Sequence, residues 1–192
     1  DRELRSIVVT SASPSEGKTF TCVNIGAVMA LSGARTLVID SDLRRPRCHQ
    51  VFDVRNEKGL TNMVMDNSLS MDEMVYKSEI PGLDVLFTGP LPPNPSELIH
   101  TNGFKRTIQR ALDEYDRVIF DSPPVCVVTD AQVLGQQVDG AVLVAQASTT
   151  NRHMLAKATR LLTSVNVRIL GALLNKLDLD NGGYGQYYYY QY

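Results

Sequence analysis

Cysteine is scarce in this sequence, and long apolar runs are absent from it. Three cysteines occur among 192 residues, and their wide spacing lacks the close pairs of zinc sites and favours reduced thiols in a reducing compartment. No apolar run approaches the roughly 18 residues that a membrane-spanning helix requires. The net charge of -2 argues against a general nucleic-acid binder, so no nucleic-acid partner is expected.

The remaining composition is ordinary for a soluble globular protein. Hydrophobic residues make up 43% of the chain and charged residues 21%, and the length suits one domain with a sizeable core. The C-terminal end differs, because Gly182–Tyr192 is a low-complexity segment of glycine, tyrosine and glutamine. We therefore divide the chain into a globular domain over residues 1–180 and a flexible tyrosine-cluster tail over 181–192. Because the chain opens on Asp1 rather than methionine, we expect a domain excised from a longer protein.

A phosphate-loop motif stands near the start of the chain. Ala12–Thr19, A-S-P-S-E-G-K-T, follows the apolar run Ile7–Val9 and leads into a helical pattern from Lys18. Alanine replaces the first glycine of the pattern G-x-x-x-x-G-K-[ST]. A strand, a tight loop and a helix N-terminus direct unpaired N–H groups and a positive dipole at one anion. We predict a nucleoside triphosphate site, with Lys18 on the β- and γ-phosphates and the Thr19 hydroxyl on Mg²⁺. The predicted nucleotide-binding residues are Ser13, Pro14, Ser15, Glu16, Gly17, Lys18, Thr19, Phe20 and, at the base, Asn175.

Strands and helices alternate along the rest of the chain. Apolar and β-branched runs predict strands over residues 5–11, 36–40, 83–87, 117–121, 140–146 and 168–174. Helical periodicity predicts helices over 19–31, 103–114, 130–137 and 152–164, a helix start at 94–97, and two short methionine-containing helices between residues 42 and 82. The alternation predicts an α/β P-loop NTPase fold, with a mainly parallel central sheet and helices on both faces.

Three carboxylates stand where predicted strands end. Asp40 closes the strand 36–40, Asp42 lies two residues on, and Asp121 closes the strand 117–121. Ligands of open parallel sheets bind beyond the carboxyl ends of the strands, so we predict that these three side chains and Thr19 hold Mg²⁺. One of Asp40 and Asp42 helps hold the metal, and the other accepts a proton from an attacking hydroxyl.

A basic run, Arg44–Arg47, follows at once and is predicted to lie beside the γ-phosphate. We expect Arg44 to stabilise phosphoryl charge or to hold an anionic partner. The predicted catalytic residues are Lys18, Asp40, Asp42, Asp121 and Arg44.

The segment Asn175–Asp178, N-K-L-D, does not decide whether the nucleotide base is guanine or adenine. It fits the N-K-x-D pattern that reads guanine, whereas an asparagine at this point can equally contact adenine. Against a GTPase, Ser122-Pro123-Pro124 follows Asp121 without the glycine of D-x-x-G, whose N–H meets the γ-phosphate in many GTPases. A GTPase therefore stays an alternative.

Several motifs together resemble the bacterial tyrosine kinases, or BY-kinases, of polysaccharide co-polymerase systems. They are S-A-S-P-S-E-G-K-T, L-V-I-D-S-D-L-R-R-P, F-D-S-P-P, P-P-N-P-S-E-L and the tyrosine-packed C-terminus. BY-kinases are P-loop proteins related to the MinD/ParA ATPases. The resemblance implies ATP and Mg²⁺ as cofactors, a Walker A motif at Ala12–Thr19, a Walker A′ motif at Leu37–Arg44 and a Walker B motif at Val118–Asp121.

Ser13 bears on the choice between a kinase and a MinD/ParA-like ATPase, and residues 1–5 bear on ring formation. Ser13 stands where MinD/ParA ATPases carry a lysine that reaches across a dimer interface, which favours the kinase family. A MinD/ParA-like ATPase switch stays the second alternative. Residues 1–5 do not fit the E-x-x-R-x-x-R helix through which BY-kinases form rings, so a ring is expected only where an upstream helix is present.

Six of the eight tyrosines lie in the C-terminal tail. A glycine-rich tether can deliver their hydroxyls to an active site, and the resemblance implies autophosphorylation there. Each phosphate adds about −1.5 to −2 charge, so we expect unphosphorylated tails to dock in neighbouring subunits and accumulated charge to separate them. Tyr76 and Tyr115 fall in helical patterns and are expected to be structural. The expected acceptors are Tyr184, Tyr187, Tyr188, Tyr189, Tyr190 and Tyr192.

These expectations combine into an ATP-dependent protein-tyrosine autokinase that regulates exopolysaccharide or capsule synthesis and export. The expected partners are the tail of a neighbouring subunit in a homo-oligomer, a membrane-spanning co-polymerase portion or activator, and a protein-tyrosine phosphatase. The domain is expected at the cytoplasmic face of the bacterial inner membrane, as part of or bound to a membrane protein, while this fragment itself is soluble.

Overall fold

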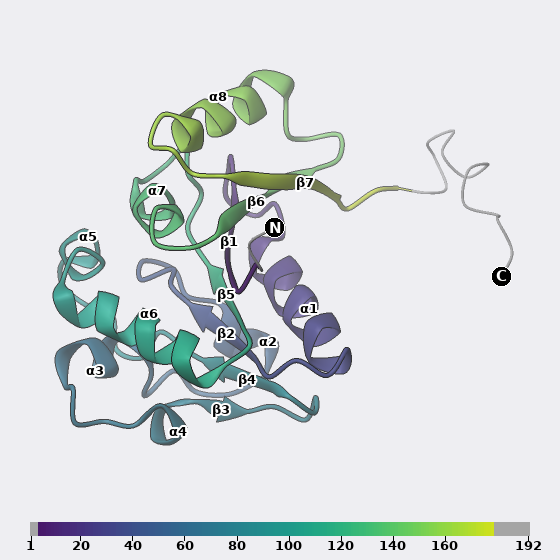
Figure 1. The fold of residues 1–192 in the computed structure, drawn as a ribbon. Helices are drawn as coiled ribbons and strands as arrows, with labels where there is room; N and C mark the ends of the chain where they lie inside the picture. The colour runs from purple at the N-terminus through teal and green to yellow at the C-terminus, as the bar shows by residue number, and fades with distance from the viewer. Residues whose placement is uncertain (1–3, 179–192) are drawn as a thin grey trace, which may run out of the picture.

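Seven strands form one central sheet in the computed structural model, which describes residues 4–178 (Figure 1). Their spatial order is β3-β4-β2-β5-β1-β6-β7, and each neighbouring pair is parallel except the antiparallel pair of β3 and β4. The predicted mainly parallel α/β sheet is therefore confirmed. In chain order the strands are β1 (Ser6–Ser11), β2 (Thr36–Asp40), β3 (Tyr76–Lys77), β4 (Leu83–Leu86), β5 (Arg117–Asp121), β6 (Gly140–Gln146) and β7 (Ile169–Asn175).

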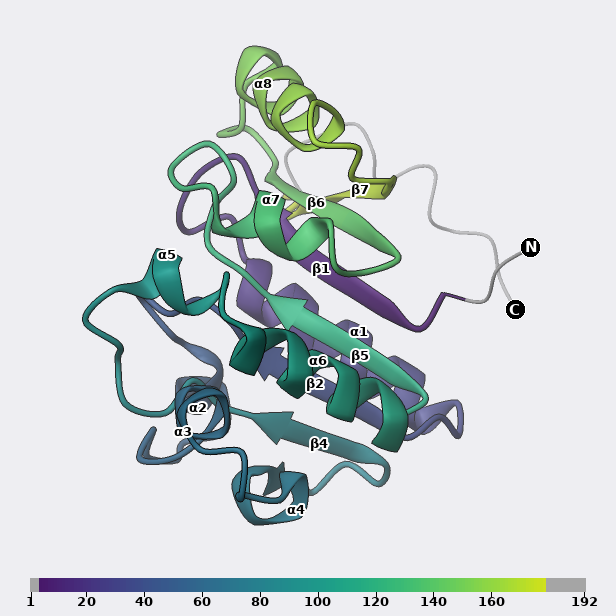
Figure 2. The same cartoon turned by 60° about the vertical axis from the view of Figure 1, so that its left-hand side comes forward.

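Helices cover both faces of this sheet (Figures 1 and 2). Helix α1 packs on one face, and α6, α7 and α8 pack on the other, with α3 against α6. The helices are α1 (Lys18–Leu31), α2 (Cys48–Val51), α3 (Leu60–Met65), α4 (Met71–Met74), α5 (Pro95–Leu98), α6 (Asn102–Glu114), α7 (Asp130–Gly135) and α8 (Arg152–Thr163).

Alternation along the central strands explains why both faces need a cover. Successive side chains of a strand point to opposite faces, so Ile119 of β5 joins the cluster that contains Val23 of α1. Its neighbour Phe120 joins the other cluster, with Phe104 of α6. Ile119, Phe120 and Phe104 are fully buried, and Val23 is buried with 6% of its surface exposed. Continuous apolar strands of this kind require helices on both sides.

The carboxyl ends of the parallel strands meet at one edge of the sheet, and this edge positions the candidate site. Strands β2 and β5 pair in register so that Asp40 lies opposite Asp121. Strand β1 lies between β5 and β6, and the loop that follows it opens into α1 at the same edge. The register therefore places the two strand-terminal carboxylates next to the start of α1.

Two short elements were not predicted. Helix α2 and strand β3 are four and two residues long, too short for a periodic pattern to reveal them. The helical prediction for Tyr76 is wrong, because Tyr76 begins β3 and its ring packs against Phe52 and Phe87. Tyr115 directly follows α6, where its hydroxyl donates to Asp84 Oδ2 at 2.6 Å.

No helix within residues 4–178 is long and apolar enough to cross a membrane. The three cysteines all lie in this described part of the chain, and each is a free thiol.

Candidate functional site

The loop between β1 and α1 is a tight turn that brings backbone close to the end of β7. Gly17 has φ +93°, a left-handed conformation that favours glycine. A Cβ atom at Gly17 would lie 2.0 Å from Asn175 Nδ2, so no other residue fits without displacing Asn175. The next residue, Lys18, begins α1. The unpaired N–H groups of that helix N-terminus and of the loop form an anion cradle.

Three side chains brace this loop from behind. The buried Glu16 accepts a hydrogen bond from the Ser13 amide at 2.7 Å and another from the Thr150 hydroxyl. Asn175 Nδ2 donates to the Glu16 carbonyl at 3.1 Å, and Lys176 Nζ donates to the Ser15 carbonyl at 2.8 Å. Glu16 and Asn175 are predicted to bind nucleotide. In the structure the Glu16 carboxylate and Asn175 Nδ2 form hydrogen bonds that hold the loop in its conformation.

A cavity of about 750 Å³ opens in front of the loop. The loop 41–47, helix α2 and residues 123–128 after β5 all contribute residues to its lining. Of the predicted nucleotide-binding residues, six line the cavity: Pro14, Ser15, Gly17, Lys18, Thr19 and Phe20. Ser13, Glu16 and Asn175 are not among its lining residues. Asp42 and Arg44 also line it, so with Lys18 three members of the predicted catalytic set face the same space.

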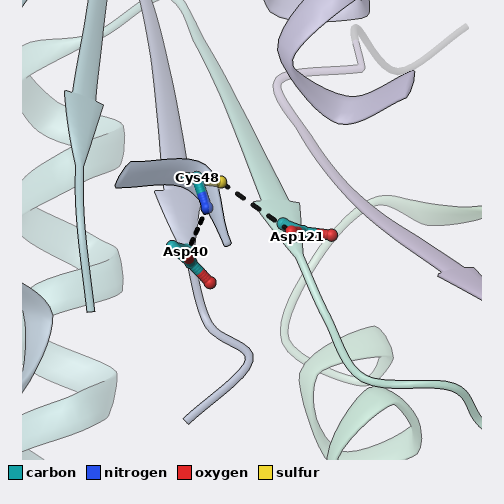
Figure 3. A group of neighbouring side chains, drawn as sticks. All are labelled: Asp40, Cys48 and Asp121. Carbon is teal, nitrogen blue, oxygen red and sulfur yellow. Dashed lines mark hydrogen bonds between the residues drawn. The ribbon is translucent and has the colours of Figure 1, made fainter. Parts of the chain in front are cut away.

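The strand-terminal carboxylates lie deeper, beside Cys48 of α2 (Figure 3). One candidate metal-ligand atom from each of Asp40, Cys48 and Asp121 lies within 4.8 Å of the others. Asp121 Oδ2 accepts hydrogen bonds from the Thr19 hydroxyl at 2.5 Å and from Cys48 Sγ at 3.8 Å. Its Oδ1 is buried and has no hydrogen-bond partner within the described residues. Such an orphaned buried oxygen is costly unless a cation or donor completes it.

Burial shifts the proton equilibria of this group. It raises the pKa of Asp121 to about 8, with the charge of Asp40 adding to the effect. It also raises the pKa of Asp40 to about 6. Burial lowers the pKa of Lys18, although the charges of Asp121 and Asp42 oppose that change. A divalent cation reverses this balance, because it favours the ionised carboxylates that surround it.

The donor set suits Mg²⁺, a hard cation that prefers oxygen. Thr19 and Asp121 supply a hydroxyl and a buried carboxylate, and Asp42 supplies a second carboxylate on the cavity wall. Asp40 has less capacity left to bind a cation, because its Oδ2 already accepts hydrogen bonds from the amides of Arg47 and Cys48 at 3.0 and 2.8 Å. Thr19 and Asp121 would therefore hold the ion, with Asp40 shaping the loop beside it.

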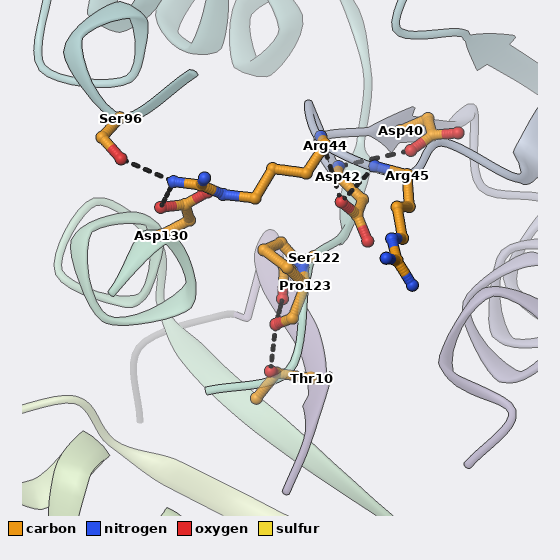
Figure 4. Close-up of polar contacts among 9 residues, drawn as sticks. All are labelled: Thr10, Asp40, Asp42, Arg44, Arg45, Ser96, Ser122, Pro123 and Asp130. Carbon is orange, nitrogen blue, oxygen red and sulfur yellow. Dashed lines mark hydrogen bonds and ion pairs between the residues drawn. The ribbon is translucent and has the colours of Figure 1, made fainter. Parts of the chain in front are cut away.

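The guanidinium of Arg44 points toward Asp130 at the start of α7 (Figure 4). Its Nε donates to Asp130 Oδ2 at 2.9 Å and its Nη2 donates to Asp130 Oδ1 at 3.2 Å. Nη2 also donates to Ser96 Oγ at 2.6 Å. Arg44, which is predicted to lie beside the γ-phosphate, lines the cavity, and its guanidinium is bound by Asp130.

Sequence reasoning missed Asp130, Thr150 and Cys48 as residues of this site. No motif marks them, because each reaches the site through a contact with a residue far away in the chain. Asp130 contacts Arg44 86 positions away, and Thr150 contacts Glu16 134 positions away. Cys48 has a sequence signal only in retrospect, since it follows the Asp40–Arg47 segment that carries the acidic pair.

The fold and this site define a P-loop NTPase. The AAA domain family matches residues 4–170. The septum site-determining protein MinD of Pyrococcus horikoshii, in complex with Mg-ADP, has the same fold, with a TM-score of 0.71 at 19% identity over 88% of this chain and 69% of that one.

Closer relatives refine the class. Tyrosine-protein kinase YwqD of Bacillus subtilis is 42% identical over 190 residues, covering 99% of this chain and 79% of that protein. The kinase domain of the Escherichia coli tyrosine kinase ETK has a TM-score of 0.86 at 35% identity, covering 92% of this chain and 69% of that one. The full E. coli kinase etk is longer, and the chain spans 24% of it. The chain belongs to the family of bacterial tyrosine kinases, the BY-kinases.

Proposed function

We propose that this chain is an ATP-dependent protein-tyrosine kinase whose acceptors include the tyrosines of its own C-terminal cluster. The proposal is carried by the contact of Thr19 with Asp121, next to Lys18 at a phosphate loop. The second oxygen of Asp121 is buried and has no partner among residues 4–178. Membership of the tyrosine kinase family supports the choice of acceptor. The proposed organisation is a kinase domain over residues 1–180 and a tyrosine-cluster tail over 181–192.

The proposed reaction transfers the γ-phosphoryl group of ATP to a tyrosine hydroxyl. The bond between the γ-phosphorus and the β,γ-bridging oxygen breaks, a phosphorus–phenol oxygen bond forms, and ADP leaves. The backbone of the loop and Lys18 hold the phosphates, and Asp42 on the cavity wall accepts the phenolic proton. When bound, Mg²⁺ neutralises charge on the phosphate oxygens.

Asp42 is a better candidate for the base than Asp40. Asp42 lines the cavity, whereas Asp40 is fully buried and its carboxylate accepts backbone amides. The phenol has an ordinary pKa of about 10, so its proton leaves late, as the oxygen becomes more acidic during transfer. A loose transition state demands little of the base.

The expected acceptors, all six tail tyrosines, lie outside the described residues. We propose that an unphosphorylated tail docks in the site of a neighbouring copy, and that accumulated phosphate charge separates the copies. Six phosphates would add roughly −9 to −12 to a chain of net charge -2. If the fully phosphorylated form and a form with all six tail tyrosines changed to phenylalanine sedimented identically, with an upstream helix present, this part of the proposal would be wrong.

The proposed setting is a membrane-associated system for exopolysaccharide or capsule synthesis at the cytoplasmic face of the inner membrane. The long relative etk, of which the chain covers 24%, and the short relative YwqD, of which it covers 79%, support two arrangements. The kinase domain is either fused to a membrane-spanning co-polymerase portion or activated by a separate one. A protein-tyrosine phosphatase would reverse the modification.

Mass spectrometry of the protein after incubation with Mg²⁺ and ATP tests the proposal. We expect phosphotyrosine on the tail of the wild type, at least a hundredfold less in Lys18→Met, and no change in Lys105→Met, an exposed control on α6. Phosphate release without phosphotyrosine would instead favour the MinD/ParA-like switch, and a preference for GTP would favour the GTPase.

A further inference from the structure

The two loops that bound the cavity are joined by a side chain. The loop 41–47 follows β2, and the loop 122–129 follows β5 and leads into α7. Both contribute residues to the lining of the cavity. Arg44, in the middle of the first loop, makes a two-point ion pair at 2.9 and 3.2 Å with Asp130, the residue of α7 that directly follows the second loop (Figure 4).

The Asp130 end of this ion pair is buried. Asp130 is the first residue of α7, its side chain is 1% exposed, and Arg44 supplies the charge that a buried carboxylate requires. A planar guanidinium that binds both carboxylate oxygens is fixed in orientation as well as position. Ser96 of α5 accepts a further hydrogen bond from the same guanidinium at 2.6 Å, so three segments meet there.

The Arg44 end of this ion pair is coupled to the proposed base. Asp42 Oδ1 accepts the backbone amides of Arg44 at 3.2 Å and Arg45 at 2.9 Å. A shift of the Arg44 backbone therefore shifts a donor that orients the Asp42 carboxylate. At its base the loop is held separately, because the Ser41 amide donates to the Asp121 carbonyl at 2.9 Å. Near the tip, Leu43 is buried in the core, and Arg44 makes polar side-chain contacts with Asp130 and Ser96.

We infer that Asp130 is a positioning residue for phosphoryl transfer, which it serves by holding Arg44 and, through the Arg44 amide, the Asp42 carboxylate. This inference rests on the proposed kinase function. Asp130 itself is not among the residues that line the cavity. Its loss leaves the nucleotide cradle of Gly17 and Lys18 intact and misplaces the base, and a misplacement of about 1 Å can cost roughly a hundredfold in rate.

A double-mutant cycle on the tail phosphorylation rate tests the pair. We expect Asp130→Asn and Arg44→Gln each to lower kcat about 10- to 100-fold, with the KM for Mg-ATP changed less than about twofold. Because the two side chains act as a unit, the double variant should be no more than about threefold slower than either single one. Multiplying losses, or a raised KM at unchanged kcat, would overturn the inference.

The matched control is Asp116→Asn. Asp116 pairs with Arg35 at 3.5 Å, and both side chains are about half exposed or more. The pair lies at the amino ends of strands β2 and β5, whereas the candidate site lies at their carboxyl ends. We expect its rates to equal those of the wild type. Arg44→Gln removes a side chain that is 35% exposed, so it tests the pair even where Asp130→Asn lowers the melting temperature.

Hydrogen exchange of the Mg-ADP complex gives a readout that does not depend on kinase activity. The amides of residues 41–47 should exchange at least about tenfold faster in Asp130→Asn than in wild type and Asp116→Asn, while those of α1 stay unchanged. Unchanged exchange at 41–47 would overturn the inference. A wild type that makes no phosphotyrosine would overturn the kinase proposal alone, since the exchange measurement still decides whether Asp130 holds the loop.

Discussion

Thr19 and Asp121 are 102 positions apart in the chain, yet the hydroxyl of one donates to a carboxylate oxygen of the other at 2.5 Å. The parallel pairing of β1 with β5 brings them together, because Thr19 lies in the helix that follows β1 and Asp121 is the last residue of β5. The remaining oxygen of Asp121 is buried and unpartnered within residues 4–178. This pair therefore defines where a cation would complete the site.

Removing the Asp121 carboxylate should weaken the binding of ADP only when Mg²⁺ is present. We expect Asp121→Asn to lower the affinity for Mg-ADP at least roughly tenfold and to leave the weak binding of ADP in a chelating buffer nearly unchanged. Calorimetric titration with and without Mg²⁺ measures both. Asp113→Asn, on the exposed side of α6, is the control. Equal losses with and without Mg²⁺ would contradict a role in holding the ion.

The raised pKa values of Asp121, about 8, and Asp40, about 6, predict how stability depends on pH. Both carboxyls keep protons in the folded chain at pH values where an ordinary carboxyl, with a pKa near 4, has lost them. The folded state therefore binds more protons than the unfolded state, and stability falls as pH rises through this window.

Melting temperatures from pH 5 to 8 in a cation-free buffer test this linkage. The wild type should lose more stability across the range than Asp121→Asn, which lacks one of the two titrating groups. Mg²⁺ with ADP should reduce the loss, because the cation favours the ionised carboxylates. Parallel curves for the two proteins would show that Asp121 does not titrate in this range.

Alanine substitutions at Gly17 and Gly33 distinguish the cost of a left-handed backbone from the cost of a steric clash. Both have φ near +95°, but a Cβ at Gly17 would lie 2.0 Å from Asn175, whereas a Cβ at Gly33 would meet no atom of the described residues within 4 Å. We expect each alanine variant to lose about 1–2 kcal/mol for the left-handed conformation. Gly17→Ala should in addition lose most of its affinity for Mg-ADP, since Asn175 is pushed from the Glu16 carbonyl. Equal affinities in the two variants would argue against a crowded loop.

Glu16 is expected to act on nucleotide affinity without touching the nucleotide. Its carboxylate accepts hydrogen bonds from the Ser13 amide and the Thr150 hydroxyl, and it is 2% exposed. Hydrogen bonds to a charged group contribute about 1.5–3 kcal/mol each. Glu16→Ala should therefore lower both the melting temperature and the affinity for Mg-ADP, and Thr150→Val, which removes one bond, should have a smaller effect of the same kind. A larger effect of Thr150→Val would contradict this order.

Most of the fold could be predicted because its signals are local. The apolar runs of the parallel strands and the periodicity of α1, α6 and α8 lie within single segments, and those elements end within a residue or two of their predicted bounds. The errors fall where local signals are short. Strand β3 forms because Tyr76 packs on Phe52 and Phe87, a contact between three segments.

By itself, the sequence determined that the chain carries a phosphate loop and that acidic side chains end two of its strands. Spacing within a strand–loop–helix unit and at strand ends is a local property, so the residue order encodes it. Only the tertiary structure decided what these side chains contact. Glu16 and Asn175 brace the loop, Asp40 accepts backbone amides, and Arg44 is held by Asp130. These pairings arise from the register of parallel strands and the packing of helices on them, which bring together residues that are far apart in the chain.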